Sequence, residues 1–152
     1  MMKKIVVTSD SHGKIHNLYN IYKQNKDADM FIHLGDYVSD AEKASRRLGI
    51  DVICVKANGD FSSFLPLHKE VLIERNKILA VHGHIERVKF SLTRLSFLAR
   101  EKQADIVLFG HTHIPLIENN GILFVNPGHA FGGQYAILTI EKGVANAEIK
   151  KL

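Results

Sequence analysis

The sequence predicts an α/β protein with two mixed β-sheets packed face to face and helices on their outer faces. In the first 60 residues, short apolar runs alternate with helical patterns, which is typical of parallel strands joined by right-handed crossovers. In the second half, neighbouring apolar runs are separated by short turns, which is typical of antiparallel hairpins. The length of 152 residues, without a linker or repeat, predicts one domain over residues 1–152.

The first half contains three predicted strands and two predicted helices. The strands are short β-branched or apolar runs, and the helices carry apolar residues at three- and four-residue spacing. In chain order we expect a strand over 4–8, a helix over 15–24, a strand over 30–34, a helix over 39–48 and a strand over 51–55. Ser39 or Asp40 would cap the second helix, and Gly49 would end it.

The second half contains more strands than helices. We expect strands over 71–74 and 78–81, a helix over 90–100, a strand over 105–109, and two hairpins, 116–118 with 122–125 and 134–140 with 144–149. Asn120 and Gly121 support the first hairpin, because an Asn-Gly pair accepts the positive φ angles of a tight turn. Phe61, Phe64 and Leu65 are expected in the core or at an interface.

Composition places the chain among soluble globular proteins. Its residues are 45% hydrophobic and 24% charged, and no apolar run is long enough to span a bilayer. The first residues lead directly into a strand, so we expect a cytoplasmic protein with no membrane partner. Cys54, the single cysteine, excludes an internal disulfide and is expected to be a small buried side chain. The net charge of +4 is compatible with an anionic substrate but too small to indicate nucleic acid.

Polar side chains follow the predicted strands at the points where the strands end. Asp36 comes directly after an apolar run and Gly35, and six other residues stand in comparable places: Asp10, His12, Asn58, His82, His111 and His113. Ligands gather at the carboxyl ends of strands in open α/β sheets. In extended backbone, side chains two residues apart point the same way, so Asp10 and His12 could reach one ion, as could His111 and His113. The pattern predicts a two-metal site with Asp36 as the bridging ligand.

Carboxylate, imidazole and amide ligands suit borderline divalent ions. We expect two such ions, with Mn²⁺ first and Fe²⁺, Zn²⁺, Ni²⁺ or Mg²⁺ as alternatives. Two ions about 3.5–4 Å apart polarise a bridging water to hydroxide and clamp a phosphoryl group for in-line attack. The ligand types therefore favour hydrolysis of an anionic phosphoester.

These residues also have structural interpretations. Asp10 could cap the following helix, Asn58 could form an ordinary turn with the next glycine, and His82 could be a hydrogen-bonded core histidine. His111 and His113 fit a metal better, because two histidines on one face repel when charged. Three further histidines are expected at the surface, the core edge and a loop, in that order: His16, His33 and His68.

The ordered set of motifs resembles the motif series of the calcineurin-like metallophosphoesterases, and the resemblance covers nearly the whole chain. The matching segments are Asp10-x-His12, Gly35-Asp36-x-x-x-Asp40, Asn58-Gly59-Asp60, His82-Gly83-His84 and Gly110-His111-Thr112-His113. Asn126-Pro127-Gly128 resembles the segment that follows in the small phosphodiesterases of the YfcE type. Each motif alone is unspecific, whereas the ordered set is highly specific.

The resemblance implies a four-layer αββα sandwich with a dinuclear metal site. Carried over by position, the ligands of the first ion are Asp10, His12, Asp36 and His113, and those of the second are Asp36, Asn58, His82 and His111. The expected catalytic set is Asp36, Asn58, His82 and His84. Asp40 and Asp60 match acidic positions that support the ligands and do not bind the ions.

One position departs from the pattern of the family. Many members have a histidine where this chain has Gly59, and that histidine is assigned to protonating the leaving group; YfcE-type enzymes often lack it too. Losing general acid catalysis typically costs about 10²–10⁴-fold, so we expect dependence on good leaving groups. His84 or His129 could supply the proton instead, and His129 stands where a serine is commoner.

The sequence therefore predicts a divalent-metal-dependent phosphoesterase, in particular a phosphodiesterase that hydrolyses small or activated diesters through a metal-bridging hydroxide. The alternative is a non-catalytic, metal-binding protein-interaction module, as in the retromer subunit that resembles this family. A nuclease is a third hypothesis, but members that cut DNA usually carry additional domains. We expect a small phosphoester substrate and no nucleic acid, and a homo-oligomer is left open.

Overall fold

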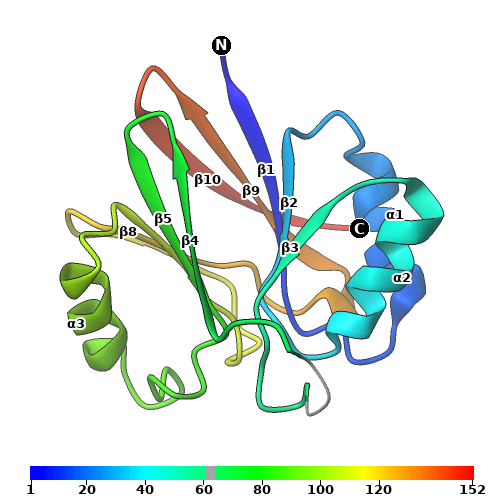
Figure 1. Cartoon of the computed structure of the whole chain (residues 1–152), viewed down its shortest axis with the longest axis horizontal. Helices are drawn as coiled ribbons and strands as arrows, with labels where there is room; N and C mark the ends of the chain where they lie inside the picture. Colours follow the sequence, from blue (N-terminus) through cyan, green and yellow to red (C-terminus); the bar gives the residue numbers. More distant parts are fainter. Residues whose placement is uncertain (61–63) are drawn as a thin grey trace.

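The computed structural model describes residues 1–60 and 64–152. Within these ranges, two five-stranded sheets lie face to face; α1 and α2 cover the outer face of one sheet, and α3 covers the outer face of the other (Figure 1). The layers follow one another as helix, sheet, sheet and helix, which confirms the predicted αββα sandwich. No helix in the described ranges has the length and hydropathy needed to cross a membrane.

The first sheet combines a parallel half with an antiparallel half. Its strand order is β10-β9-β1-β2-β3, with β1, β2 and β3 parallel and β9 and β10 antiparallel to their neighbours. The strands are β1 (Lys3–Thr8), β2 (Met30–His33), β3 (Val52–Cys54), β9 (Gln134–Glu141) and β10 (Val144–Lys151). Helices α1 (Ile15–Gln24) and α2 (Val38–Leu48) are the crossovers between the parallel strands, as the sequence predicts.

The second sheet has a parallel centre and antiparallel edges. Its order is β4-β5-β6-β8-β7, in which β5, β6 and β8 are parallel. The strands are β4 (His68–Ile73), β5 (Asn76–Val81), β6 (Ile106–Leu108), β7 (Leu116–Asn119) and β8 (Leu123–Asn126). Helix α3 (Thr93–Glu101) joins β5 to β6, and the short 3₁₀ helix η1 (Ala130–Gly132) leads from β8 to β9.

The central strands are apolar on both faces because each sheet is covered twice. In β1, Ile5 and Val7 belong to the core between the sheets, whereas Val6 packs under α1 and α2. In β5, Ala80 lies between the sheets and Leu79 packs against α3. This double coverage explains why the sequence shows continuous apolar runs where a half-exposed sheet would alternate with polar residues.

Helix α3 is shorter than the sequence pattern predicts. It begins at Thr93 and not at residue 90, and its buried residues are Leu95 and Ala99. Phe90 and Phe97, which belong to the predicted apolar stripe, are 87% and 63% exposed. The predicted range was too long because tertiary packing, and not local spacing, decides which apolar side chains are covered.

Helix α2 also begins before the predicted caps. Its first residue is Val38, ahead of Ser39 and Asp40, and its N-cap residue Tyr37 has a left-handed φ of 69° and makes no side-chain cap. The carboxylate of Asp60, from the loop after β3, accepts a hydrogen bond from the Val38 backbone N–H. Asp60, which is distant in sequence, therefore caps the N-terminus of α2 in place of a local side chain.

Several single-residue expectations can be compared directly with the fold. His33 is buried at the end of β2, as expected, but His68 is the first residue of β4 and not part of a loop. Cys54 packs partly buried under the helices of the first sheet, and burial raises the pKa of its thiol to about 12. Phe64 is fully exposed and so is not a core residue, and Phe61 lies outside the described residues.

Candidate metal centre

The loops that follow the strands of both sheets meet in the lower part of Figure 1 and bring four predicted ligands together. Asp10, His12, Asp36 and His113, here called the first cluster, each offer one ligand atom, and these atoms lie within 4.8 Å of one another. His12 Nε2 lies 2.9 Å from Asp36 Oδ2 and 3.2 Å from His113 Nε2. His113 follows the second sheet and the other three follow the first, so the cluster depends on the packing of the two sheets.

The two carboxylate oxygens of Asp10 lie in different surroundings. Oδ2 accepts hydrogen bonds from Ser9 Oγ at 2.6 Å and from the His111 backbone N–H at 3.1 Å. Oδ1 is buried and has no hydrogen bond among the described residues; it lies 3.4 Å from His113 Nε2 and 3.9 Å from His82 Nε2. An unpaired buried carboxylate oxygen is costly, and a cation between it and these imidazoles would remove the cost. This donor set fits a divalent metal.

His82 and His111, here called the second pair, lie beside the first cluster. His82 Nδ1 donates to the Leu34 carbonyl at 2.8 Å, which leaves the lone pair of Nε2 facing His111 Nδ1 at 3.1 Å. A hydrogen bond of this kind to the remote ring nitrogen is the usual way in which a metal-binding histidine is oriented. Burial lowers the pKa of both histidines to about 4, so both are neutral at pH 7, the form that binds metals.

Asp36 belongs to the first cluster and also interacts electrostatically with His82 of the second pair. Burial raises its pKa; the His12 imidazole opposes that change, and the neighbouring Asp10 carboxylate adds to it. Two carboxylates that face one space carry their charges at a cost, which a bound divalent cation reverses. The electrostatics of Asp36 are therefore consistent with its predicted role as a bridging ligand.

Asp60 supports the loop that carries Asp36. Its two carboxylate oxygens accept four backbone hydrogen bonds at 2.9–3.0 Å, from the N–H groups of Asp36, Tyr37, Val38 and Ala57. These bonds join the loop after β2 to the loop after β3. The arrangement agrees with the supporting role expected of Asp60, because it orients a candidate ligand through that residue's own backbone.

Asp40 supports the loop after β1. It is buried in the first turn of α2, and its Oδ2 accepts a hydrogen bond from the Gly13 N–H at 2.8 Å. Gly13 follows His12 directly, so this bond fixes the backbone next to a candidate ligand. The two supporting carboxylates thus act on different ligand loops.

The candidate ligands have unusual backbone conformations. Asp10, His12, Asp36, His111 and His113 all have φ between 48° and 71°. Non-glycine residues adopt this left-handed region rarely and at a cost of about 1–3 kcal/mol, mostly at functional sites. The expectation that Asp10 and His12, and His111 and His113, are presented from extended backbone was therefore wrong: turns bring them together.

Asn58 and Gly59 follow β3 in a turn that borders Asp36. Asn58 is exposed. A Cβ atom added to Gly59 would collide with Asp36 Oδ1. A side chain at residue 59 would therefore conflict with the Asp36 carboxylate in its present position.

The two substitute proton donors lie on opposite sides of the centre. The ring of His84 is centred 5.6 Å from that of His82, and its Nδ1 is buried without a hydrogen bond. The ring of His129 is centred 5.7 Å from that of His113, and its Nδ1 accepts from the Gly132 N–H at 3.0 Å. Nε2 of neutral His129 therefore carries the proton. Burial lowers the pKa of both His84 and His129.

Sequence reasoning missed several residues that shape the centre. The rings of Tyr37 and Phe131 are centred 5.6 Å and 6.2 Å from that of His12. The ammonium group of Lys14 lies 5.4 Å from the centre of the Phe131 ring. Tyr37 could have been found from its place next to Asp36, whereas no sequence signal marks Phe131, which η1 brings to the site.

Comparison with known proteins defines the class to which this fold and this centre belong. The profile of the calcineurin-like phosphoesterase superfamily domain matches residues 2–143. The chain therefore belongs to the calcineurin-like phosphoesterase superfamily.

Individual relatives extend along most of the chain. The probable metallophosphoesterase YsnB of Bacillus subtilis is 33% identical over 150 residues, which cover 93% of this chain and 86% of YsnB. Phosphodiesterase YfcE of Escherichia coli K12 is 28% identical over 153 residues, which cover 84% of this chain and 79% of YfcE. A crystal structure of a Streptococcus pneumoniae protein, described as a predicted phosphoesterase, superposes with a TM-score of 0.84 at 26% identity. The superposition covers 99% of this chain and 90% of that protein.

A shorter match has a different kind of name. Vacuolar protein sorting-associated protein 29 of Schizosaccharomyces pombe is 42% identical over 83 residues, which cover 54% of this chain and 44% of that protein. The chain is thus similar both to proteins named as phosphoesterases and to a protein named for sorting.

Proposed function

We propose that this chain is a divalent-metal-dependent phosphodiesterase that hydrolyses small or activated phosphodiesters. The observation that carries the proposal is the buried Asp10 Oδ1, which has no hydrogen bond within residues 1–60 and 64–152 and faces imidazole nitrogens of the first cluster and the second pair. A structural aspartate would have both oxygens satisfied. The similarity to YfcE, a phosphodiesterase, supports the choice of diester substrates.

The proposed centre holds two ions, with Mn²⁺ first and Fe²⁺, Zn²⁺, Ni²⁺ or Mg²⁺ as alternatives. The first ion would be held by Asp10, His12, Asp36 and His113, and the second by Asp36, Asn58, His82 and His111. Such ions, when bound, activate water and neutralise phosphoryl charge. No thiolate is offered, because the thiol of Cys54 lies under the helices of the first sheet.

The chain itself contributes orientation and proton control. Asp60 fixes the backbone of Asp36, and the Leu34 carbonyl holds His82 with Nε2 directed at the centre. His84, beside the second pair, is proposed to give a proton to the leaving group, because Gly59 has no side chain that could do so. The remaining parts of the proposal are one domain over residues 1–152, a cytoplasmic location and a substrate that is not nucleic acid.

Metal-stripped protein provides the test. Hydrolysis of bis-p-nitrophenyl phosphate and p-nitrophenyl phosphate is measured after adding Mn²⁺, Ni²⁺, Zn²⁺ or Mg²⁺, beside Asp36→Asn and, as the matched control, Asp51→Asn. Asp51 is an exposed aspartate just before β3. We expect metal-dependent cleavage of the diester that is lost in Asp36→Asn and kept in Asp51→Asn.

A second candidate function is a non-catalytic protein-interaction module of the same fold. The match to the sorting-associated protein of S. pombe favours it. Bound ions without turnover of either ester, under any metal, would contradict the phosphodiesterase and support this module. Pull-down of a partner by the metal-loaded wild type but not by Asp36→Asn would then link the interaction to the centre.

A further inference from the structure

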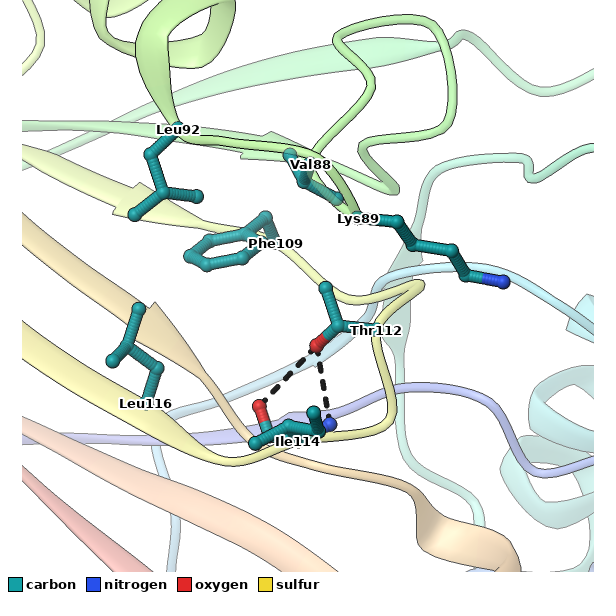
Figure 2. A pocket seen from close by; sticks show the side chains of 7 residues that line it. All are labelled: Val88, Lys89, Leu92, Phe109, Thr112, Ile114 and Leu116. Carbon is teal, nitrogen blue, oxygen red and sulfur yellow. Dashed lines mark hydrogen bonds between the residues drawn. The ribbon is translucent and has the colours of Figure 1, made fainter.

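An apolar pocket of about 480 Å³ is lined by residues from the segments that follow β5 and β6 (Figure 2). Leu92, before α3, and Leu116, at the start of β7, stand on either side of the Phe109 ring. The remaining lining side chains are Val88, Lys89, Thr112 and Ile114. A volume of this size is typical of small-molecule sites, which are mostly apolar with a few polar groups.

The pocket shares its walls with the candidate metal ligands. Thr112, in one wall, stands between His111 and His113 in the chain. Val88, in another wall, packs against Gly83 so closely that a Cβ on that glycine would lie 2.8 Å from a Val88 methyl group. Gly83 separates His82 from His84. A ligand in the pocket would therefore adjoin the loops that carry the second pair.

Polar groups of the pocket are already engaged or lie at its rim. Thr112 Oγ1 exchanges hydrogen bonds with the backbone of Ile114 and accepts one from Asn126 Nδ2. Its methyl group is thus left for the pocket. The Lys89 ammonium extends away from the apolar side chains in Figure 2. After burial and His82, its positive charge is a further cause of the lowered pKa of His111. The pocket is apolar inside and cationic at the edge nearest the centre.

We propose that this pocket binds an apolar ester group, aryl or bulky alkyl, of a substrate whose phosphoryl group lies at the metal centre beside Lys89. The proposal rests on the proposed function and narrows its substrate class to amphipathic phosphoesters. The apolar walls favour an apolar occupant, because Thr112 Oγ1 is engaged by Ile114 and Asn126, and the Lys89 ammonium favours an anionic group on its side.

The test compares two ligands with the same anionic head. Benzylphosphonate and methylphosphonate are titrated calorimetrically into Mn²⁺-loaded protein; their P–C bonds are not hydrolysed, so binding is read without turnover. We expect benzylphosphonate to bind about 10–100-fold more tightly, because the ring leaves water for the apolar pocket. Ile114→Asp should reduce this ratio to below about threefold, because it places a charge on the pocket wall.

Matched variants separate the pocket from general effects. Ile114 is 68% exposed, so its replacement is compatible with folding, which a thermal melt verifies. Ile117→Asp, on the opposite face of β7 from Leu116, should keep the wild-type ratio. Lys89→Ala should weaken both phosphonates by a similar factor of about 2–5, because each loses one exposed charge partner.

The outcomes distinguish the pocket from the proposed activity. Equal affinity for the two phosphonates, a ratio unchanged by Ile114→Asp, or binding of neither would overturn the pocket proposal. Preferential binding of benzylphosphonate together with no hydrolysis of bis-p-nitrophenyl phosphate would overturn the phosphodiesterase but keep the pocket. Hydrolysis of bis-p-nitrophenyl phosphate without preferential binding of benzylphosphonate would overturn the pocket proposal but keep the phosphodiesterase.

Discussion

At the level of a single residue, the carboxylate of Asp10 combines one hydrogen-bonded oxygen with one oxygen that can bind a metal. Ser9 and the backbone of His111 satisfy one of its oxygens, and this holds the carboxylate in a single orientation. The other oxygen is buried among imidazoles and has no hydrogen bond in the part of the chain that the structure describes. Fixing one oxygen of a carboxylate while leaving the other free is what a preformed ligand requires.

His84 is the residue for which a single substitution separates two proton-transfer hypotheses. We expect His84→Ala to lower turnover of an unactivated dialkyl phosphate by about 10²–10⁴-fold and to change that of bis-p-nitrophenyl phosphate little, because p-nitrophenolate leaves without a proton. His129→Ala, on the other side of the centre, is the comparison and should retain both activities. Steady-state kinetics with both diesters gives the answer.

Either of two results would contradict this assignment. Equal activity of His84→Ala and wild type on the dialkyl phosphate would remove His84 as the acid. A loss confined to His129→Ala would move the role to His129, whose Nε2 carries a proton when its ring is neutral.

At the scale of elements, one carboxylate joins two loops and a helix. Asp60 binds the N–H groups of Asp36 and Tyr37 after β2, of Val38 at the start of α2, and of Ala57 after β3. Helix N-termini favour negative charge, so the same side chain stabilises α2 and holds the left-handed turn of a candidate ligand. Stability of α2 and geometry of the centre are therefore coupled.

Asp60→Asn tests this coupling. Replacing one oxygen by an NH₂ group sets a donor against backbone donors, so we expect Mn²⁺ affinity to fall about 10–100-fold and the free energy of unfolding to fall by about 1–3 kcal/mol. Calorimetric Mn²⁺ titration and urea unfolding measure the two effects, with Asp51→Asn as the control. A variant that loses stability but binds Mn²⁺ as the wild type does would show that Asp60 serves α2 alone.

At the scale of the whole molecule, the buried His33 and His82 and the partly buried His111 link stability to pH. Burial lowers the pKa of His33, His82 and His111 to about 4 from the ordinary 6.5. Between these values the unfolded chain binds protons that the folded protein does not, so the free energy of unfolding falls as the pH falls from 6.5 toward 4.

Metal-free protein should show this directly. We expect its melting temperature to fall by at least about 5 °C between pH 7 and pH 4.5. His33→Gln should reduce the slope, because one of the three groups is removed, while substitution of the exposed His16 by alanine should leave it unchanged. A melting temperature that stays constant or rises over this range would show that these histidines are not buried in neutral form.

The centre itself is a property of the whole molecule. Asp10 and Asp36 come from the first sheet, and His82 and His113 from the second, so the ligands meet only when the sheets pack over their shared core. A metal that bridges them binds the folded state alone and should add to its stability.

The class of fold, the order of the elements and the candidate ligands could be predicted without coordinates, because they follow from local signals in the sequence. The apolar runs that become β1, β2, β5 and β6, and the polar residues directly after them, can be identified without any contact. Tertiary structure alone decided what depends on contacts between distant segments. Asp60 caps α2, Phe90 and Phe97 remain exposed, and the turns of Asp10 and His111 are left-handed. Contacts between segments that are distant in sequence supply the interactions that hold these conformations, and they also bring together the pocket walls, which follow β5 and β6.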